Sequence, residues 1–483
     1  MYFCTKHLVM NLPEDFIRRT RSLLGDEYDT FQAALEQPPS NSIRLNPAKA
    51  TGSLPDRVPW CNSGYYLSER LTYTFDPLFH AGAYYVQEAS SMFLEQVLKQ
   101  YVHHPVRYLD LCAAPGGKST HAASVLPAGS LVVSNEITDS RIHILTENLI
   151  KWGAGNVVVT HNDASDFSPL TDYFDVILTD VPCSGEGMFR KDPNTINEWS
   201  VENVAQCSDR QRIILSRIWG TLRPGGILVY STCTYNTEEN EQIIRYLQTT
   251  FGAELLPVAT PPEWNICKGL SGETRVNRFL PHRTRGEGFF LAALRKPETE
   301  TANRQELIGK LLKRIARKKT KRGKTEIVPK EIKQWINGND SFHFLVQEDK
   351  IIALPQTYSD EITLFFSLLD VTYAGIEIAT QKGKEWIPSH ACAMSVHCNR
   401  QIFPEKELSP SQAIAYLRRE ALQLPPDTPK GFVLLTYQNL PLGWVKNLGT
   451  RANNLYPQEW RIRTGYTPEQ LKTLSNLFPI SLH

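Results

Sequence analysis

The sequence lacks the cysteine spacing that marks several common classes of protein. Its 483 residues include nine cysteines, yet no two of them form a CxxC pair. An odd number of cysteines without this spacing argues against a disulfide framework and against a zinc ribbon. We therefore expect reduced thiols, no bound metal and a location in the cytoplasm.

Long apolar runs and internal repeats are also missing. Charged residues and Pro13 interrupt the N-terminus before an apolar stretch develops, which is unlike a signal peptide. No run is long enough to span a bilayer, and no fixed period indicates a solenoid or a propeller. With 41% hydrophobic and 21% charged residues, the composition is that of a globular protein with about three domains. We expect a monomer without a membrane partner.

The chain has little net charge, because its formal charge at pH 7 is only +1. Attraction to a polyanion must therefore come from local clusters. Between Lys310 and Lys324 there are nine Lys or Arg residues and no acid. This segment is equally compatible with RNA contact and with a solvated linker. Arg283 and Arg285 are weaker candidates for RNA contact.

Strands alternate with helical stretches from about residue 105 to 296, which is the pattern of an α/β domain. The predicted strands are nearly continuous apolar runs, as expected for a parallel sheet with helices on both faces. They are VRYLDL, SLVVSNEI, NVVVTHND, FDVILTDVP, GGILVYSTCT and GFFLAAL. Ligands of such sheets bind beyond the carboxyl ends of the strands, where the polar clusters of this chain also fall.

The first of these clusters is a loop suited to a nucleotide-like cofactor. Small residues and glycines let the backbone approach a ligand closely, while the Walker spacing for phosphate is absent. The loop comprises Cys112, Ala113, Ala114, Pro115, Gly116, Gly117 and Lys118. Glu136 and Asp163 end the next two strands, where an acid can accept hydrogen bonds from a ribose. An adenosine-like cofactor is indicated.

Two cysteines follow later strands, Cys183 in Asp180-Val-Pro-Cys and Cys233 in Ser-Thr-Cys-Thr. A buried packing role is the common one for a free cysteine. Their Pro, Ser, Thr and Gly neighbours at strand exits favour a chemical role instead. A helix predicted to begin near Asn236 would favour a thiolate at Cys233, an effect that Glu238, Glu239 and Glu241 weaken.

The segments DLCAAPGGKST, DVPCSGEGMFR and YSTCTYNTEENE resemble the signatures of the Sun-type RNA cytosine-C5 methyltransferases. SIRLNPAK and YYVQEASSM are similar to upstream segments of that family, so the resemblance covers roughly residues 40 to 296. It implies a Rossmann-like core that binds S-adenosylmethionine through Cys112 to Lys118, Glu136, Asp163 and Asp180. It also implies that Cys233 is the nucleophile, that Cys183 assists product release and that Asp180 holds the cytosine ring edge. At position 181 this chain has Val, where that family often has Ala or Pro.

The C-terminal segment GFVLLTYQNLPLGWVKNLGTRANNLYPQEWRIR resembles the PUA-like RNA-binding ending of bacterial small-subunit ribosomal RNA methyltransferases. It favours 16S ribosomal RNA as the substrate. Trp444 and Trp460 could stack on bases, although packing in the core is the commoner role. The expected fold is thus α/β, a Rossmann-like methyltransferase core with a small N-terminal module and a C-terminal α+β PUA-like region.

The resemblance and the composition together divide the chain into successive parts. We expect an N-terminal RNA-binding module (1–95), a catalytic domain (96–298), a basic linker or helix (299–325), an intermediate domain (326–380) and a PUA-like RNA-binding domain (381–483). Alternative functions are a transfer RNA cytosine-C5 methyltransferase and an RNA-binding ribosome-assembly factor. A DNA cytosine methyltransferase is disfavoured, because its nucleophile usually stands between Pro and Gln, whereas Cys183 precedes Ser184.

Overall fold

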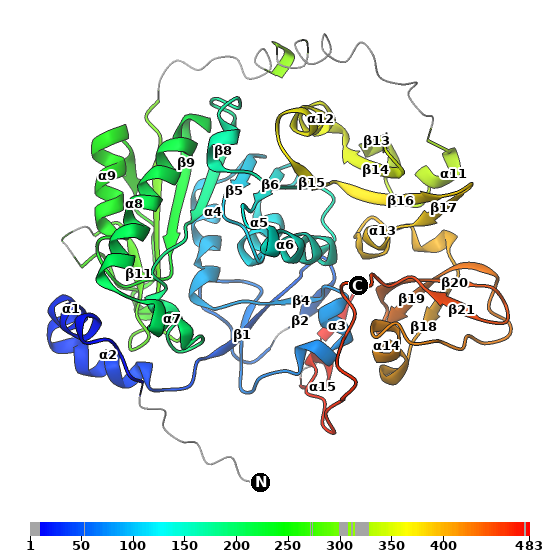
Figure 1. Cartoon of the computed structure of the whole chain (residues 1–483), viewed down its shortest axis with the longest axis horizontal. Helices are drawn as coiled ribbons and strands as arrows, with labels where there is room; N and C mark the ends of the chain where they lie inside the picture. Colours follow the sequence, from blue (N-terminus) through cyan, green and yellow to red (C-terminus); the bar gives the residue numbers. More distant parts are fainter. Residues whose placement is uncertain are drawn as a thin grey trace.

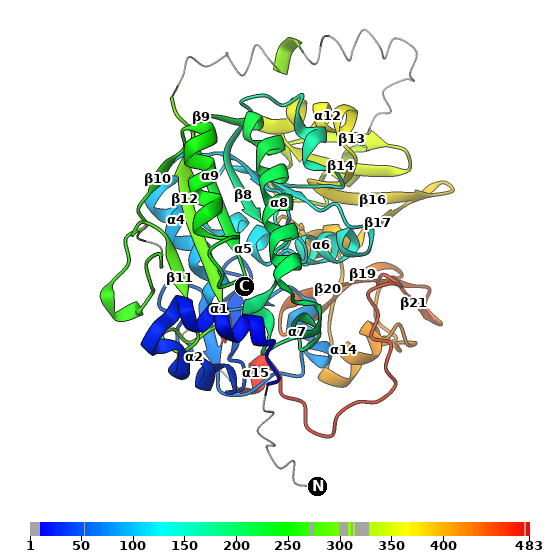
Figure 2. The ribbon, with the colours of Figure 1, turned by 60° about the vertical axis from the view of Figure 1, so that its left-hand side comes forward.

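Figures 1 and 2 show the computed structural model, which describes residues 10–52, 54–270, 272, 274–298, 308–310, 313, 328–477 and 480–483. A large mixed sheet forms its centre. In the basic segment that begins at Lys310, only residues 310 and 313 are described. The RNA contact predicted for the rest of that segment lies outside the described residues.

The central sheet contains the strands that the sequence predicts, because each is an apolar run buried on both faces. The order of the whole sheet is β10 (Glu254–Leu256), β12 (Phe289–Arg295), β9 (Leu222–Thr232), β8 (Phe174–Asp180), β5 (Arg107–Asp110), β6 (Leu131–Asn135), β7 (Val157–Thr160) and β15 (Val371–Ala374), with β11 (Asn277–Phe279) paired to β12. The strands β10, β11 and β15 were not among those predicted. The strands from β9 to β7 run parallel, and the remaining pairings are antiparallel.

Helices cover both faces of this sheet (Figure 2). One face packs against α4 (Leu94–Tyr101), α5 (Gly117–Val125) and α6 (Asp139–Trp152), and the other against α8 (Val201–Ile218) and α9 (Glu241–Phe251). The sheet has β6 and β8 on opposite sides of β5, so the connections from β5 diverge there. A crevice opens at such a point beyond the carboxyl end of the strand.

The N-terminal module begins with two helices, α1 (Glu14–Leu24) and α2 (Tyr28–Leu35). Gly25, which has a φ of 56° and so a conformation that glycine adopts readily, lies between them. Phe16 of α1 packs edge-on against Phe189 and Trp199, in the region that includes α7 (Asn194–Glu198). The module continues with a sheet of β3 (Gly64–Leu67), β1 (Asn41–Leu45) and β4 (Tyr84–Val86), and with α3 (Pro77–His80).

The region after residue 328 contributes directly to the core of the catalytic domain. Its edge strand β15 pairs with β7, and α12 (Ser359–Leu368) packs into the cluster on one face of the central sheet. Arg107 of β5 forms a hydrogen-bonded ion pair with Glu361 of α12 through Nη2 and Oε1, 2.6 Å apart. The rest of this region is α11 (Lys330–Lys333), α13 (His390–Met394) and a sheet of β13 (Phe342–Gln347), β14 (Lys350–Pro355), β16 (Ile376–Lys382) and β17 (Glu385–Pro388).

The last part of the chain folds back onto the N-terminal module. It contains α14 (Pro410–Leu417) and a sheet of β18 (Glu405–Glu407), β19 (Gly431–Tyr437), β20 (Leu440–Asn447) and β21 (Ala452–Asn454). After α15 (Leu474–Leu477), β22 (Ile480–Leu482) pairs antiparallel with β2 (Ala50–Gly52). Trp444 is buried and donates a hydrogen bond to the carbonyl of Ser389, so it packs in the core, as the sequence favoured.

Candidate active site

A cavity of about 370 Å³ lies beyond the carboxyl ends of β5, β8 and β9. Its wall includes Asp110, Asp180 and Cys233, each of which ends or follows one of these strands. The N-terminal module contributes Tyr85, and the start of β12 contributes Phe289. The cavity wall therefore combines residues from the N-terminal module, from the ends of the parallel strands β5, β8 and β9, and from β12.

Most of the loop predicted to bind the cofactor lies at this cavity. The lining residues from the loop are Cys112, Ala113, Ala114, Pro115, Gly117 and Lys118. Gly116 is not among them; it has a φ of 111°, a left-handed conformation that glycine adopts readily, and it precedes the first residue of α5. The Ala114–Pro115 peptide bond is cis. Burial raises the pKa of the Cys112 thiol.

Glu136 lies behind the loop and not in the cavity wall. Its Oε2 accepts a hydrogen bond from the amide of Ala114 at 3.3 Å, and Oε1 accepts one from the amide of Thr138 at 2.9 Å. The Arg141 Nη1 lies 3.6 Å from Oε2. In this structure, Glu136 therefore supports the loop from a position just after β6.

Asp163 is also outside the residues that line the cavity. It caps the short 3-10 helix Ala164–Phe167 by accepting from the amide of Ser165, and it pairs with Arg217 at 3.0 Å. The hydrogen bond from the Ser165 side chain, with the smaller effect of Arg217, lowers the pKa of this half-exposed carboxyl. Its part in cofactor binding stays a prediction.

The two predicted cysteines meet, since their Sγ atoms lie 3.2 Å apart. The hydrogen bond with Cys233, together with burial, raises the pKa of Cys183 well above its usual range. Cys183 thus keeps its proton and can donate its S–H to the sulfur of Cys233. Cys233 lines the cavity, whereas Cys183 is not among the lining residues.

The helix expected near Asn236 begins later, at Glu241, and so its N-terminus does not immediately follow Cys233. The intervening loop is held instead by Glu186. The Oε2 of this buried carboxylate accepts from the Thr234 hydroxyl at 2.7 Å and from the amides of Tyr235 and Asn236 at 2.7 and 2.9 Å. The predicted start of the helix near Asn236 is therefore wrong, because the hydrogen bonds to Glu186 hold this segment in a loop.

Further hydrogen bonds tie the two cysteine loops together. Ser184 donates its amide hydrogen to Glu239 Oε2 at 3.0 Å, and Gly187 donates to the carbonyl of Cys233 at 2.8 Å. Burial raises the pKa of Glu239. Glu241, which was expected to face the helix dipole, forms a buried ion pair with Arg278. The network fixes the separation of the sulfur atoms.

Asp180 stands at the centre of the charged part of the cavity. Its Oδ2 accepts from Lys118 Nζ at 2.7 Å, and its Oδ1 accepts from the Ser231 hydroxyl at 2.7 Å. Lys118 belongs to the cofactor loop and Ser231 to the strand that leads to Cys233. Asp180 therefore connects the cofactor loop with the cysteines.

Asp110 was not singled out as a site residue, although it begins the loop motif. Its Oδ2 accepts from the Ser119 hydroxyl at 2.7 Å, while its buried Oδ1 has no hydrogen-bond partner within the described part of the chain. Burial raises the pKa of this carboxyl to about 7. The sequence signal for Asp110 is an acidic residue just before a glycine-containing loop. Its position in the cavity wall could be recognised only from the three-dimensional structure.

The residues that line the cavity fit S-adenosylmethionine, a molecule that carries positive charge and an adenosine moiety. The free oxygen of Asp110 offers an acceptor to a positively charged group, and small or apolar side chains such as Ala113, Pro115 and Phe289 suit an aromatic base.

No helix in the described ranges is long and apolar enough to cross a membrane. The two arginines that were weaker candidates for RNA contact both form ion pairs within the protein. Arg283 pairs with Glu27, and Arg285 pairs with Asp56.

Three family models match the chain in succession. The N-terminal domain of 16S rRNA methyltransferase RsmF matches residues 12–89, the model of 16S rRNA methyltransferase RsmB/F matches residues 97–295, and the methyltransferase RsmF PUA domain matches residues 403–462. The middle match contains the cavity-forming loops after β5, β8 and β9.

Curated relatives and solved structures agree with these matches. Ribosomal RNA small subunit methyltransferase F of Serratia proteamaculans is 32% identical over 93% of this chain and 96% of that protein. The protein of the same name from Citrobacter koseri is 32% identical over 92% and 96%. A methyltransferase homologue from Pyrococcus horikoshii has a TM-score of 0.51 and 29% identity over 59% of this chain and 96% of that one.

A second solved structure shares the fold. NSun6 from Pyrococcus horikoshii, in a structure with SFG, has a TM-score of 0.51 and 22% identity over 60% of this chain and all of that one, 100%. The matches to the N-terminal, catalytic and PUA models cover the chain in the same order as the parts described above. The chain therefore belongs to the ribosomal RNA small subunit methyltransferase F family, and it is an S-adenosylmethionine-dependent methyltransferase.

Proposed function

We propose that this protein methylates C5 of a cytosine in 16S ribosomal RNA through a covalent bond between Cys233 and C6 of the base. The observation that carries the proposal is the 3.2 Å separation of the Cys183 and Cys233 sulfur atoms at a cavity that also holds Asp180 and the cofactor loop. Cytosine C5 is a weak nucleophile, and a thiolate is the group that can activate it.

Cys233 performs the first step. The Cys233 thiol loses its proton to solvent, and the thiolate adds to C6. The electron pair of the C5–C6 double bond is left on C5 and delocalised through C4 onto N3, so C5 becomes nucleophilic. The S–H of Cys183 donates to the sulfur of Cys233 and so stabilises its anion before attack. Asp180 holds the polar edge of the ring, with its own position set by Lys118 and Ser231.

Bound S-adenosylmethionine supplies the electrophilic methyl group. Residues Cys112 to Lys118 would hold it, with Glu136 supporting the loop from behind and Asp163 as a further candidate. Asp180 lies next to Lys118, and so the base and the methyl donor can meet at one side of the cavity.

Cys183 acts again during release. The proton on C5 passes to a water molecule, the C5–C6 double bond forms again and the bond between C6 and Cys233 breaks. The departing sulfur regains the hydrogen bond from Cys183, which lowers the cost of its negative charge. Each cysteine thus has its own step, although they lie side by side.

The relatives support ribosomal RNA as the substrate, since they are named for the small ribosomal subunit. The match to a PUA domain at residues 403–462 supports RNA binding by the C-terminal part. Such an enzyme would act in the cytoplasm, where reduced cysteines persist. A transfer RNA substrate and a non-catalytic assembly role are the alternatives.

The test uses purified protein, labelled S-adenosylmethionine and unmodified RNA. We expect 5-methylcytosine in 16S ribosomal RNA and not in transfer RNA after digestion and mass spectrometry, with bisulfite sequencing to locate the nucleotide. Label at another position of the base would overturn the chemistry, and label only in transfer RNA would overturn the substrate. Ribosomal RNA offered both free and within assembled subunits shows which form is modified.

A further inference from the structure

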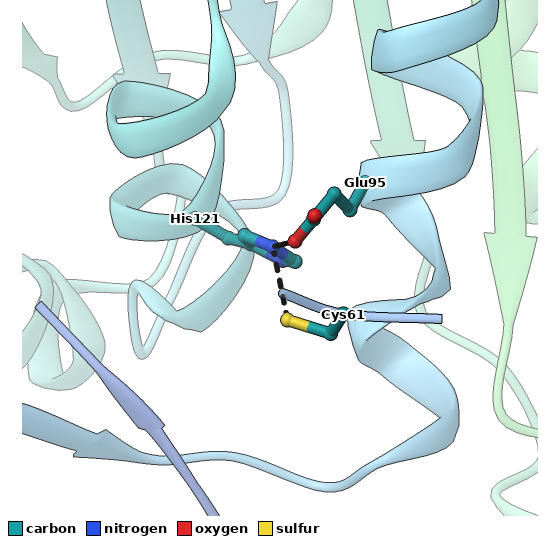
Figure 3. A group of neighbouring side chains, drawn as sticks. All are labelled: Cys61, Glu95 and His121. Atoms are coloured by element: carbon teal, nitrogen blue, oxygen red, sulfur yellow. Dashed lines mark hydrogen bonds and ion pairs between the residues drawn. The ribbon is translucent and has the colours of Figure 1, made fainter. Parts of the chain in front are cut away.

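Apart from the active site, three buried side chains from distant parts of the sequence point toward one another (Figure 3). They are Cys61, in the loop before β3, Glu95 of α4 and His121 of α5. Each is at most 1% exposed. The long stretches of sequence between them resemble no metal motif, so the sequence alone does not reveal the cluster.

The separations of their ligand atoms suit one small cation. Cys61 Sγ lies 3.6 Å from His121 Nε2, His121 Nε2 lies 3.0 Å from Glu95 Oε2, and all three atoms lie within 4.8 Å of one another. Tetrahedral zinc with its usual bond lengths sets neighbouring ligand atoms about 3.3 to 3.6 Å apart. The side chains would need to move by only a few tenths of an ångström along these two edges.

Glu95 is oriented so that one oxygen faces the cluster. Its Oε1 accepts from Lys99 Nζ at 2.6 Å and from the amide of Asn62 at 3.1 Å. Its Oε2 is the oxygen that faces His121. Lys99 therefore occupies the oxygen that a cation would not use, and such outer contacts commonly orient ligating carboxylates.

The protonation states and charges are compatible with a divalent cation. Burial lowers the pKa of His121 to about 4, so its imidazole is neutral at pH 7, the form that binds metal. Burial raises the pKa of Cys61 to about 12, so metal binding must displace the thiol proton, as it does at zinc thiolate sites. A thiolate and a carboxylate together neutralise the ion. The two cations near the cluster, Arg44, whose charge acts on Cys61, and Lys99, which pairs with Glu95, then face a group without net charge.

We propose that Cys61, Glu95 and His121 bind a zinc ion, which this mixed set of sulfur, nitrogen and oxygen ligands favours. The thiol proton of Cys61 goes to solvent, and the ring proton of His121 moves to Nδ1. A water molecule takes the fourth position from the adjoining cavity of about 390 Å³, which Glu95 and Asn62 line. The ion joins the N-terminal module to α4 and to α5, the helix that begins at Gly117 of the cofactor loop.

The test measures metal in the full-length protein, without RNA or S-adenosylmethionine, so its outcome is independent of the proposed reaction. We expect about one zinc per chain by mass spectrometry of the purified protein. The Cys61→Ser and His121→Gln variants should bind zinc at least about 100-fold more weakly in a chelator competition. Cys207→Ser, which removes another buried cysteine, serves as the matched control and should bind as the wild type does.

Cobalt gives a second readout, because Co²⁺ bound tetrahedrally through a thiolate absorbs strongly in the visible range. We expect this absorption for the wild type and for Cys207→Ser, and its loss in Cys61→Ser. If Cys61→Ser does not fold, as judged by circular dichroism, His121→Gln and Glu95→Gln replace it. Folded wild-type protein that takes up neither zinc nor cobalt, or ligand variants that bind as tightly as the wild type, would overturn the proposal.

Discussion

The sulfur of Cys233 lies 3.2 Å from that of Cys183, although the two residues follow different strands of the central sheet. Parallel strands β8 and β9 bring their carboxyl ends to the same edge, and Glu186 then anchors the Cys233 loop to the Cys183 loop. A pair at this distance can share one proton, so the two thiols need not have equal roles. The first two predictions separate those roles.

Replacing Cys233 by Ala removes the proposed nucleophile. We expect methyl transfer to fall by more than about 10³-fold, because without addition to C6 the C5 carbon cannot attack. The measurement is label transferred from S-adenosylmethionine to RNA. Cys267→Ala, at a buried cysteine outside the cavity wall, is the control and should retain activity. Undiminished transfer by Cys233→Ala would reject this residue as nucleophile.

Replacing Cys183 by Ser should let addition proceed while release fails. A serine hydroxyl is a far weaker acid than a thiol, so it cannot transfer its proton to the departing sulfur. We expect a covalent complex of protein and RNA, which migrates slowly on a denaturing gel. The double variant Cys183→Ser, Cys233→Ala should form none. A complex that persists in the double variant would show that another residue bonds to the base.

Glu186→Gln should loosen the Cys233 loop. Both carboxylate oxygens accept hydrogen bonds, Oε1 from Trp199 Nε1 at 3.0 Å and Oε2 from the loop amides, whereas a Gln side chain has one acceptor and presents N–H groups to these donors. We expect a loss of about 1 to 3 kcal/mol in stability and a lower kcat with little change in KM for S-adenosylmethionine. Glu238→Gln, at the neighbouring surface ion pair with Arg19, is the control. An unchanged kcat in Glu186→Gln would contradict this positioning role.

Asp110 gives the stability a pH dependence. Its pKa is raised to about 7 by burial, against about 3.9 in an unfolded chain, so the folded state holds the proton more tightly. As pH rises from about 4 to 7, the unfolded state ionises first and the folded state loses stability, by a few kcal/mol at most. We expect Asp110→Asn to raise the denaturation midpoint more at pH 8 than at pH 4.5, measured in urea. An equal change at both pH values would exclude this titration.

Phe365 links the C-terminal region to the stability of the catalytic domain. It is fully buried, and its ring lies 5.6 Å from that of Tyr173, next to β8. Phe365→Ala should cost about 3 to 5 kcal/mol, because it opens a cavity in the shared core. We expect the midpoint of the main thermal unfolding transition to fall, and methyl transfer to be lost at that same lower temperature. Ile402→Ala, at an exposed position, is the control, and loss of one signal without the other would argue for separate cores.

Much of the catalytic fold could be predicted from local sequence. A run such as VVVT at Val157–Thr160 is apolar at every position, and only a strand covered on both faces accommodates it. The loop after β5 was likewise evident from its small residues and glycines. These features depend on neighbouring residues, which a sequence displays directly.

What escaped prediction depends on contacts between distant residues. The segment from Asn236 to Asn240 has the composition of a helix start, but hydrogen bonds to Glu186 hold its beginning in a loop. The cluster of Cys61, Glu95 and His121 forms only after α4 and α5 pack together.

The pairing of β2 with β22 also constrains the order in which the protein can fold during synthesis. Residues 50–52 leave the ribosome early, whereas their partners at 480–482 leave after the whole catalytic domain. Until then β2, whose strand partner in the described sheets is β22, has unpaired backbone groups, which can pair wrongly with another chain. A ribosome that stalls before residue 480 would therefore release a product with its methyltransferase core present but with this edge exposed, a natural target for quality control.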